Sequence, residues 1–459
     1  MTQTPTYQVT DPTTGEVLEA FPHASDAEVE AAVASSVSAY AEWKWTPIER
    51  RVAITRRIAE LFEERSEELG AIITKEMGKS PSQAAGEAEY CTDIFNYYAD
   101  NGPALIEDRP LPGHEGGRIE YRPIGTVLGV MPWNYPYYQV ARFVAPNLIV
   151  GNTMVLKHAE NCPTSAIAIA EVFKDAGLPD GVYSNLLATH DQVAQLVADP
   201  RVAAVSLTGS ERAGMAVAEA AGRNLKKVVL ELGGSDPYII LDTDDVDAAA
   251  ETAWNTRIEN VGQSCNSNKR MIVMDEYFDE FVTSLTKRAA ALSPREPGDD
   301  SDDKYSPMVS RKAAEDLLSQ VQDAVQKGAT LHAGGTIVSD NGAYFAPAVL
   351  SGVTPEMRAY KEELFGPVAV VYKVSSDQEA VDLANVVDLG LGGAVFSTDE
   401  ERAIRVAQQL EVGMANVNTP AGEGADVPFG GVKRSGFGRE LGPLGIDEFV
   451  NKRLFYVQR

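Results

Sequence analysis

Short apolar runs alternate with helical stretches between residues 125 and 231. The runs are rich in Val, Leu, Ala and Met and lie at residues 125–131, 154–157, 182–187, 202–207 and 228–231. One helical pattern begins at Pro163 and another ends near Ala221, in the gaps between these runs. Because neighbouring parallel strands need a long crossover connection, this alternation is typical of a parallel sheet covered by helices. We predict an α/β fold whose ligands lie at the carboxyl ends of the strands.

The rest of the chain shows the same alternation and is too long for a single core. A chain of 459 residues is expected to form two or three domains. Capping patterns predict that Thr46 opens a helix that continues to about Met77, and that Thr398 opens another. Residues 453–458 predict a final strand with no later partner, a type of strand that often joins the sheet of a neighbouring subunit.

Charge and cysteine content argue against several classes of function. The chain has 40 Lys and Arg against 67 Asp and Glu, a net charge of −27, which argues against nucleic acid and anionic membrane as partners. It has no long apolar run of the kind that spans a bilayer and no secretory signal, so we expect a cytoplasmic protein. Cys91, Cys162 and Cys265 give neither a disulfide framework nor a metal-ligand spacing, so no metal site is predicted.

A thiol and a carboxylate are the strongest candidates for chemistry. Cys265 follows a Gly262-Gln263 turn and precedes an apolar run, where the backbone can bend and present a side chain. Glu231 closes the last run of the predicted sheet and is followed by two glycines. A thiolate is a nucleophile and a carboxylate at a strand end can act as a base. An ordinary buried cysteine is the alternative interpretation.

Other motifs follow the ends of the predicted strands. Asn134, in a Pro-Trp-Asn turn, is an amide donor suited to a developing oxyanion. Gly209 and Ser210 form a turn from strand to helix that can present N–H groups to a phosphate. Lys157 and Glu160 place a cation and an anion at the carboxyl edge. Taken alone, each motif also has a structural interpretation, as an aromatic turn, a helix start or a surface ion pair.

Together these motifs resemble the NAD(P)-dependent aldehyde dehydrogenase superfamily over nearly the whole chain. Six stretches match in order: Pro-Trp-Asn at 132–134, Lys-x-x-Glu at 157–160, Thr-Gly-Ser at 208–210, Glu-Leu-Gly-Gly at 231–234, Gly-Gln-x-Cys at 262–265 and Glu-x-Phe-Gly-Pro at 363–367. Within the superfamily the chain is most similar to bacterial succinate-semialdehyde dehydrogenases, through residues 231–237 and 428–440.

The resemblance implies a catalytic role for four residues and a substrate-binding role for a fifth. Cys265 would attack the aldehyde, and the Asn134 amide with the Cys265 N–H would hold the oxyanion of the thiohemiacetal. Glu231 would activate the water that hydrolyses the thioester. Glu440 would assist proton transfer. Arg142 matches an arginine that binds the substrate carboxylate in the succinate-semialdehyde subgroup.

The resemblance also implies a nicotinamide cofactor, held by Trp133, Lys157, Glu160, Gly209, Ser210, Glu363 and Phe365. Lys157 and Glu160 would contact the adenosine ribose, and Trp133 and Ser210 would line the phosphates. Glu363 would bind the nicotinamide ribose, with Phe365 beside the ring. A carboxylate accepts hydrogen bonds from ribose hydroxyls and repels a 2′-phosphate, so Glu160 predicts a preference for NAD over NADP.

Several positions depart from the family pattern. Phe143 stands where many members carry Lys, Ser235 where Lys or Asn is usual, and Glu259 where many succinate-semialdehyde enzymes carry Arg. Acids in the loop 422–427 stand where Ser is common. Because these acids would repel a carboxylate, a neutral or aromatic aldehyde is kept as an alternative substrate.

The fold implied by the resemblance has three parts. These are a Rossmann-like cofactor domain (1–106 and 124–233), an α/β catalytic domain (234–432), and a β oligomerisation arm with the C-terminal segment (107–123 and 433–459). A homodimer or homotetramer is expected.

Two other classes of function stay open. A hydrolase or acyltransferase with a cysteine nucleophile and no nicotinamide would need a histidine base, which neither core motif supplies. A binding protein without catalysis is disfavoured by the intact Cys265, Glu231 and Asn134.

Overall fold

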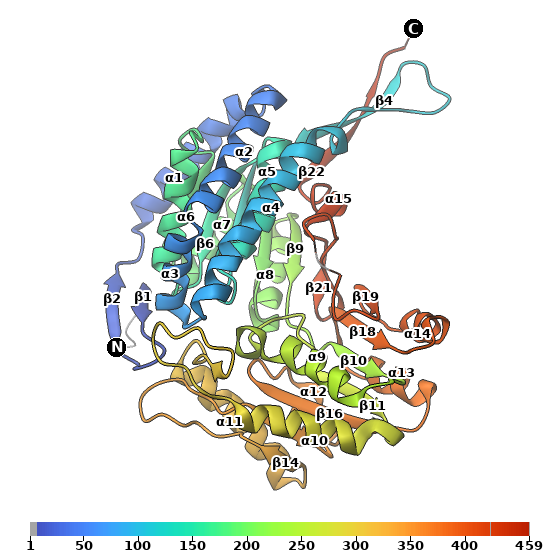
Figure 1. Ribbon diagram of the computed structural model, residues 1–459. Helices are drawn as coiled ribbons and strands as arrows, with labels where there is room; N and C mark the ends of the chain where they lie inside the picture. Colours follow the sequence, from blue (N-terminus) through green and yellow to red (C-terminus); the bar gives the residue numbers. More distant parts are fainter. Residues whose placement is uncertain (1–6, 423, 459) are drawn as a thin grey trace.

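The computed structural model describes residues 7–422 and 424–458, and two large sheets covered by helices make up most of the molecule (Figure 1). The first sheet has six strands in the order β21-β9-β8-β5-β6-β7. They are β5 (Thr126–Met131), β6 (Thr153–His158), β7 (Tyr183–Asn185), β8 (Val202–Thr208), β9 (Lys227–Glu231) and β21 (Gly436–Phe437). Strands β5 to β9 are parallel, and β21 joins β9 antiparallel. The parallel sheet predicted for residues 125–231 is confirmed.

Helices cover both faces of this sheet because its strands are apolar on both faces. In β5, successive side chains Val127 and Leu128 point to opposite faces and enter two separate cores. One core takes side chains from α2 (Ile48–Glu64), α3 (Ser66–Met77), α4 (Pro81–Leu105), α5 (Tyr138–Val150) and α6 (Pro163–Asp175). The other takes them from α1 (Asp26–Trp43), α7 (His190–Ala198) and α8 (Glu211–Arg223). The strand ends, not the faces, are therefore left for a ligand.

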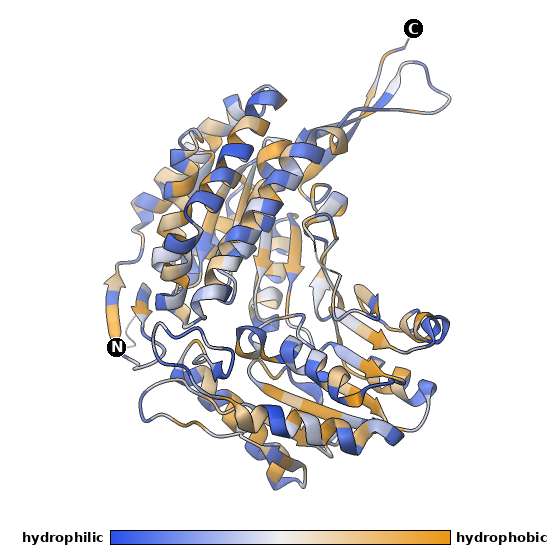
Figure 2. Cartoon of the chain, viewed as in Figure 1, coloured by the Kyte–Doolittle hydropathy of each residue, from blue (hydrophilic) through white to orange (hydrophobic). Residues whose placement is uncertain are grey.

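The second sheet has seven strands in the order β14-β15-β16-β11-β10-β18-β19. They are β10 (Pro237–Ile240), β11 (Arg270–Met274), β14 (Thr330–Ala333), β15 (Ala348–Ser351), β16 (Val368–Val374), β18 (Gly392–Phe396) and β19 (Met414–Val417). Only β14 runs antiparallel to its neighbour. The helices of the half that contains this second sheet are α9 (Val246–Ile258), α10 (Asp275–Ala291), α11 (Arg311–Gln326), α12 (Arg358–Lys361), α13 (Asp377–Asn385) and α14 (Glu400–Ala407). Figure 2 shows apolar strands between helices of mixed polarity in both halves.

A three-stranded antiparallel arm projects from the body at the upper right of Figure 1. It consists of β3 (Arg109–Pro110), β4 (Gly117–Pro123) and β22 (Val450–Tyr456). The final strand was predicted to have no later partner, and its partner is the earlier strand β4, with which β22 pairs along its whole length. The partner lies 333 residues earlier at the Arg453–Glu120 contact, which a reading of neighbouring segments does not reveal. β22 remains an edge strand of the arm.

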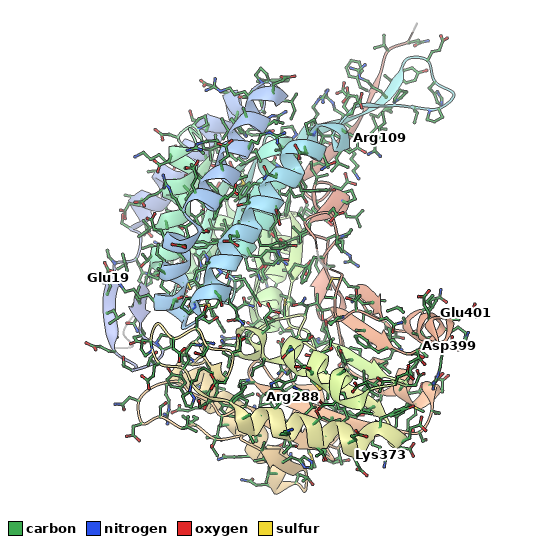
Figure 3. The ribbon with its side chains drawn as sticks, viewed as in Figure 1. Glu19, Arg109, Arg288, Lys373, Asp399 and Glu401 are labelled. Atoms are coloured by element: carbon green, nitrogen blue, oxygen red, sulfur yellow. The ribbon has the colours of Figure 1, made fainter. Side chains whose placement is uncertain are left out.

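Smaller elements connect these parts. They are the hairpin β1 (Tyr7–Thr10) with β2 (Val17–Phe21), the pairs β12 (Ser293–Pro294) with β13 (Lys304–Tyr305) and β17 (Leu389–Gly390) with β20 (Val432–Lys433), the 3₁₀ turn η1 (Glu259–Gly262) and α15 (Gly442–Gly445). None of the helices in the described ranges has the length and apolar character needed to cross a bilayer. In Figure 3 the labelled charged residues Glu19 and Glu401 lie at the periphery of the molecule.

Two predicted helix starts are wrong. The helix predicted from Thr46 to Met77 is two helices, because the backbone of Arg65 leaves helical geometry (φ −115°, ψ 15°), and its N-cap is Pro47 without a side-chain cap. Asp399, not Thr398, caps α14, because the Thr398 hydroxyl and N–H both donate to Asp242.

Candidate functional site

The carboxyl ends of four parallel strands bring the predicted motifs of the first half to one edge. Trp133 and Asn134 follow β5, Glu160 follows β6, Gly209 and Ser210 follow β8, and Glu231 ends β9. Parallel strands end at the same edge of a sheet, which is where ligands of α/β proteins bind. The structure therefore assembles these motifs as the sequence predicted.

The nucleophile candidate follows a strained turn. Asn260, Val261 and Gly262 have φ values of 46°, 54° and 70°, the left-handed region that a β-branched residue such as Val261 rarely adopts. A Cβ on Gly262 would lie 2.4 Å from the Gly366 carbonyl, so only glycine fits there. Arg257, which is fully buried, donates to the carbonyls of Gly262 (3.2 Å) and Gly366 (2.6 Å) and fixes the turn.

Cys265 itself is half-buried and lies close to two cations. Burial raises the pKa of its thiol to about 11, and the charges of Arg142 and Lys269 act against that rise. Lys269 Nζ donates to the carbonyls of Ser264 (2.6 Å) and Cys265 (2.8 Å), so this cation lies against the nucleophile's own backbone. Lys269 is not among the site residues predicted from the sequence, although it stands four residues after the thiol.

Asn134 lies against the nucleophile loop. The side chain is 4% exposed, and its Nδ2 donates to the Gln263 carbonyl at 3.1 Å, two residues before Cys265. A carboxamide has two N–H donors, so this contact leaves one donor for an oxyanion.

Two carboxyl groups and a guanidinium form the other side of the site. Neither side-chain oxygen of Glu231 has a hydrogen-bond partner among the described residues. Burial, followed by the charge of Glu440, raises the pKa of Glu231 well above its usual range. Burial also raises the pKa of Glu440, against the nearby charge of Arg142. Gly430, in the glycine-rich loop, packs against Glu231, because a Cβ there would lie 2.7 Å from Oε1.

Arg142 does not stand as an isolated cation. Its Nη2 lies 2.8 Å from Glu440 Oε2, with side chains 0% and 6% exposed, and it also donates to Gln139. Its Nη1 donates to the Tyr138 hydroxyl at 3.4 Å. Only Nε lacks a partner within the described part of the chain. The pairing with Glu440 was not foreseen, because the two residues lie on distant segments.

Glu363 and Phe365, from the second half, meet the first sheet. Glu363 Oε1 lies 3.0 Å from Lys269 Nζ and accepts from the Gly234 N–H at 3.2 Å. The Phe365 ring is edge-on to Trp133, with 5.7 Å between centroids. The two halves of the chain therefore share one site.

The adenosine-side candidates form an ion cluster. Glu160 Oε1 lies 2.5 Å from Lys157 Nζ and 3.2 Å from His190 Nε2. His190 begins α7 and lies in no motif, so it is not among the site residues predicted from the sequence. The N–H of Gly209 is already donated to the Glu231 carbonyl at 2.9 Å, and the Ser210 hydroxyl caps α8. A phosphate would therefore meet the open space above Gly209 and the first turn of α8, not the Gly209 N–H.

The departures from the family pattern are accommodated in different ways. Phe143 is buried in the core, where it packs over Gly129, and Ser235 is buried. Glu259 accepts a hydrogen bond from the Tyr135 hydroxyl at 3.2 Å. Within the loop 422–427, Glu423 lies outside the described residues.

Comparisons with known proteins agree with this geometry. The succinate-semialdehyde dehydrogenase (NADP+) of Deinococcus radiodurans is 51% identical over 449 residues, covering 98% of this chain and 94% of that protein. The succinate semialdehyde dehydrogenase (NAD(P)+) of Escherichia coli K12 is 41% identical over 450 residues, covering 98% of this chain and 97% of that protein. A crystal structure of succinic semialdehyde dehydrogenase from Streptococcus pyogenes in complex with NADP+ superposes with a TM-score of 0.95 at 41% identity, covering 99% of this chain and all of that one. The sequence model of the aldehyde dehydrogenase family matches residues 1–454, and the chain belongs to this family.

Proposed function

We propose that this chain oxidises succinate semialdehyde to the dicarboxylic acid with NAD or NADP. The observation that carries the proposal is the buried Arg142 guanidinium, whose Nη2 lies 2.8 Å from Glu440 Oε2 and whose Nε has no partner among the described residues. The relatives named as succinate-semialdehyde dehydrogenases support the substrate. They do not favour a neutral or aromatic aldehyde, a cofactor-free hydrolase or a non-catalytic protein.

The site fits a nicotinamide dinucleotide. A Cβ on Gly209 would meet only Leu207, at 3.8 Å, so the space at the start of α8 is open. A Cβ on Gly233 would lie 2.3 Å from Glu363 Oε2, so there is no room for a side chain at this position, where the two halves meet. The residues that would hold the cofactor are Trp133, Lys157, Glu160, Gly209, Ser210, Glu363 and Phe365. When bound, the cofactor accepts a hydride from the substrate.

The chain's own groups account for the first step. Cys265 Sγ attacks the aldehyde carbon as a thiolate, and the charges of Arg142 and Lys269 stabilise that thiolate against burial. The free N–H of the Asn134 amide, with the Cys265 N–H, stabilises the oxyanion that forms on the carbonyl oxygen. The product of the oxidation stays bound to Cys265 as a thioester.

Glu231 and Glu440 serve the second step. Glu231 takes a proton from the water that attacks the thioester, for which its two oxygens are available. Its raised pKa matches a base that must also release that proton. Glu440 assists proton transfer. Phe143 stands where a lysine is common, so no lysine at that position links Glu440 to the site. Glu440 acts on Glu231 through its charge and through Arg142, with which it forms an ion pair.

The distal carboxylate of the substrate would meet Arg142. Its Nη2 is engaged by Glu440, whereas Nε has no partner among the described residues and remains for a carboxylate oxygen. For the cofactor, we propose that Glu160 favours NAD. The NADP+ in the names of the relatives supports the opposite preference, and Lys157 supplies positive charge beside Glu160.

The larger organisation is proposed as predicted from the sequence. The cofactor domain comprises 1–106 and 124–233, the catalytic domain 234–432, and the arm 107–123 with 433–459. The open edge of β22 supports assembly into a homodimer or homotetramer through the arm. A cytoplasmic location stays a prediction.

The test is the formation of reduced nicotinamide, followed by absorbance, with succinate semialdehyde and either cofactor. Butanal, which has the same four-carbon chain without the carboxylate, is the control substrate. The proposal expects kcat/KM for succinate semialdehyde to exceed that for butanal by at least about tenfold, the worth of one charge-assisted hydrogen bond. A higher kcat/KM for butanal would refute the substrate, and formation of acid without reduced cofactor would refute the reaction.

A further inference from the structure

A buried ion pair holds the turn that carries Asn134. Lys79 Nζ lies 2.5 Å from Glu87 Oε2, with side chains only 1% and 2% exposed. The same Nζ donates to the Asn134 backbone carbonyl at 3.1 Å and lies 3.9 Å from the centroid of the Tyr135 ring. We propose that Lys79 and Glu87 are positioning residues for Asn134, an inference that rests on the oxyanion role given to Asn134 in the proposed function.

Glu87 fixes the helix that follows the turn. Its second oxygen accepts hydrogen bonds from the N–H groups of Tyr137 (2.8 Å) and Tyr138 (3.2 Å), at the start of α5. No side chain of α5 caps this end, so a carboxylate from α4 takes that place, next to the positive end of the helix dipole. Arg142 lies one turn further along α5. Glu87 thus holds the segment that carries both the amide donor and the guanidinium.

The turn is fixed from the opposite side by the nucleophile loop. The Asn134 carbonyl also accepts from Asn260 Nδ2 at 3.0 Å, while its side-chain amide donates to the Gln263 carbonyl at 3.1 Å. The Asn134 carbonyl is therefore held between Lys79 and the loop before Cys265. A shift of about 1 Å in a reacting or stabilising group lowers rates by on the order of a hundredfold. The gain in rate from holding Asn134 in place can therefore outweigh the energetic cost of burying an ion pair.

The contacts of the pair favour this role over a purely structural one. A buried ion pair often adds little to stability compared with apolar side chains, because both charges lose their hydration. Here the contacts of both groups lead to one place: Lys79 reaches Asn134 and Tyr135, and Glu87 reaches the first N–H groups of α5. No hydrogen bond or ring contact of the two charged groups in the described structure leads to another part of the fold.

Two reactions of Cys265 separate positioning of the oxyanion donor from damage to the nucleophile. With p-nitrophenyl acetate, the thiolate forms a C–S bond to the carbonyl carbon through a tetrahedral oxyanion, and p-nitrophenolate leaves with the electron pair of the broken C–O bond. With iodoacetamide, the thiolate displaces iodide from a saturated carbon and no oxyanion forms. Neither reaction needs the cofactor or succinate semialdehyde. Lys79→Met should slow the p-nitrophenolate burst about tenfold and leave alkylation within about twofold.

A double-mutant cycle then assigns the effect to Asn134. Asn134→Ala should slow acylation by about a hundredfold or more, as expected for loss of an oxyanion donor. Adding Lys79→Met to Asn134→Ala should cost less than about twofold more, because the group that Lys79 positions is already gone. If the fold-losses of acylation rate in the two single variants multiply in the double variant, the two residues act independently and the proposal is overturned. Equal losses of the acylation and alkylation rates in Lys79→Met would also overturn it.

Glu76→Gln is the matched control. Glu76 is a buried carboxylate that accepts hydrogen bonds from the N–H groups of Thr164 (2.6 Å) and Ser165 (3.0 Å) in the first turn of α6, and it has no hydrogen bond to Asn134 among the described residues. Glu76→Gln should lower the thermal midpoint of unfolding and leave the acylation rate within about twofold of that of the parent enzyme. If Lys79→Met does not fold, the neutral pair Lys79→Met/Glu87→Gln carries the same cycle. An enzyme that shows the coupling but does not oxidise succinate semialdehyde would refute the proposed substrate and leave this inference standing.

Discussion

Replacement of Arg142 tests the proposed substrate most directly. The guanidinium is fully buried beside Glu440, so Arg142→Gln alone would leave a buried carboxylate unpaired, at a cost of about 3–5 kcal/mol in stability. The informative variant is therefore Arg142→Gln/Glu440→Gln, which removes both charges and keeps a polar group at each position. It should fold, because the remaining amides can hydrogen-bond to one another.

The expected loss follows from one charge-assisted hydrogen bond. Such a bond contributes about 1.5–3 kcal/mol, so KM for succinate semialdehyde should rise roughly ten- to a hundredfold. Arg142 also stabilises the Cys265 thiolate, and that contribution falls on every aldehyde alike. The quantity to measure is thus the ratio of kcat/KM for succinate semialdehyde to that for butanal. This ratio should fall by roughly ten- to a hundredfold in the double variant.

Glu440→Gln alone is the control for the loss of Glu440. It keeps the guanidinium and removes its competing anion, so the ratio of charged to neutral substrate should stay unchanged or rise even where kcat falls. Equal losses for both aldehydes in the double variant would refute the role of Arg142. Such a result would assign the guanidinium to the thiolate and Glu440 alone.

Further predictions concern the thiol, the base and the cofactor. Cys265→Ala should abolish turnover and leave binding of NAD(P), followed by calorimetry, within about threefold, because the thiol is not needed to hold the cofactor; substantial turnover would contradict its assignment. Glu231→Gln should give a burst of reduced cofactor and then a slow phase, and unchanged steady-state turnover would remove Glu231 as the base. Burial raises the pKa of Glu231, and only the ionised carboxylate acts as a base. Thioester hydrolysis should therefore become faster as pH rises through that pKa, and the Gln variant should lose this pH dependence. The same raised pKa means that the folded state binds a proton more tightly than the unfolded state, so stability falls as pH rises through this range, and Glu231→Gln should raise the thermal midpoint at pH 8 more than at pH 5. Glu160→Ser should increase kcat/KM with NADP relative to NAD, and a parent enzyme that already prefers NADP would show that the argument from its carboxylate is wrong.

The fold was predictable from the sequence where hydrophobic periodicity is strong. The alternation over residues 125–231 predicted the strands of the first sheet, but it did not reveal α5, whose residues are nearly all buried and so show no amphipathic period. It also did not reveal the partner of β22, because pairing across hundreds of residues leaves no local pattern.

The site was predictable where a motif follows a strand end, and not where a charge is buried. Cys265, Asn134 and Glu231 lie in short motifs beside glycine or proline. Lys79 lies two residues before α4 and Glu87 lies in its second turn, where charged residues are usually solvated, so their burial becomes visible only in three dimensions.

The return of the chain to its own earlier strands sets the order in which the protein can mature. β9 is made about two hundred residues before β21, which covers its edge by pairing Gly436 with Glu231. The Tyr98 hydroxyl donates to the Gly442 carbonyl across 344 residues of sequence. A nascent chain that has emerged only as far as the thiol therefore has an open sheet edge that can pair with another chain, and a Glu231 side chain still in water. Its reactive thiol is already made, but the buried base is completed last, so a prematurely ended chain would expose an aggregation-prone edge before it gained any ability to turn over substrate.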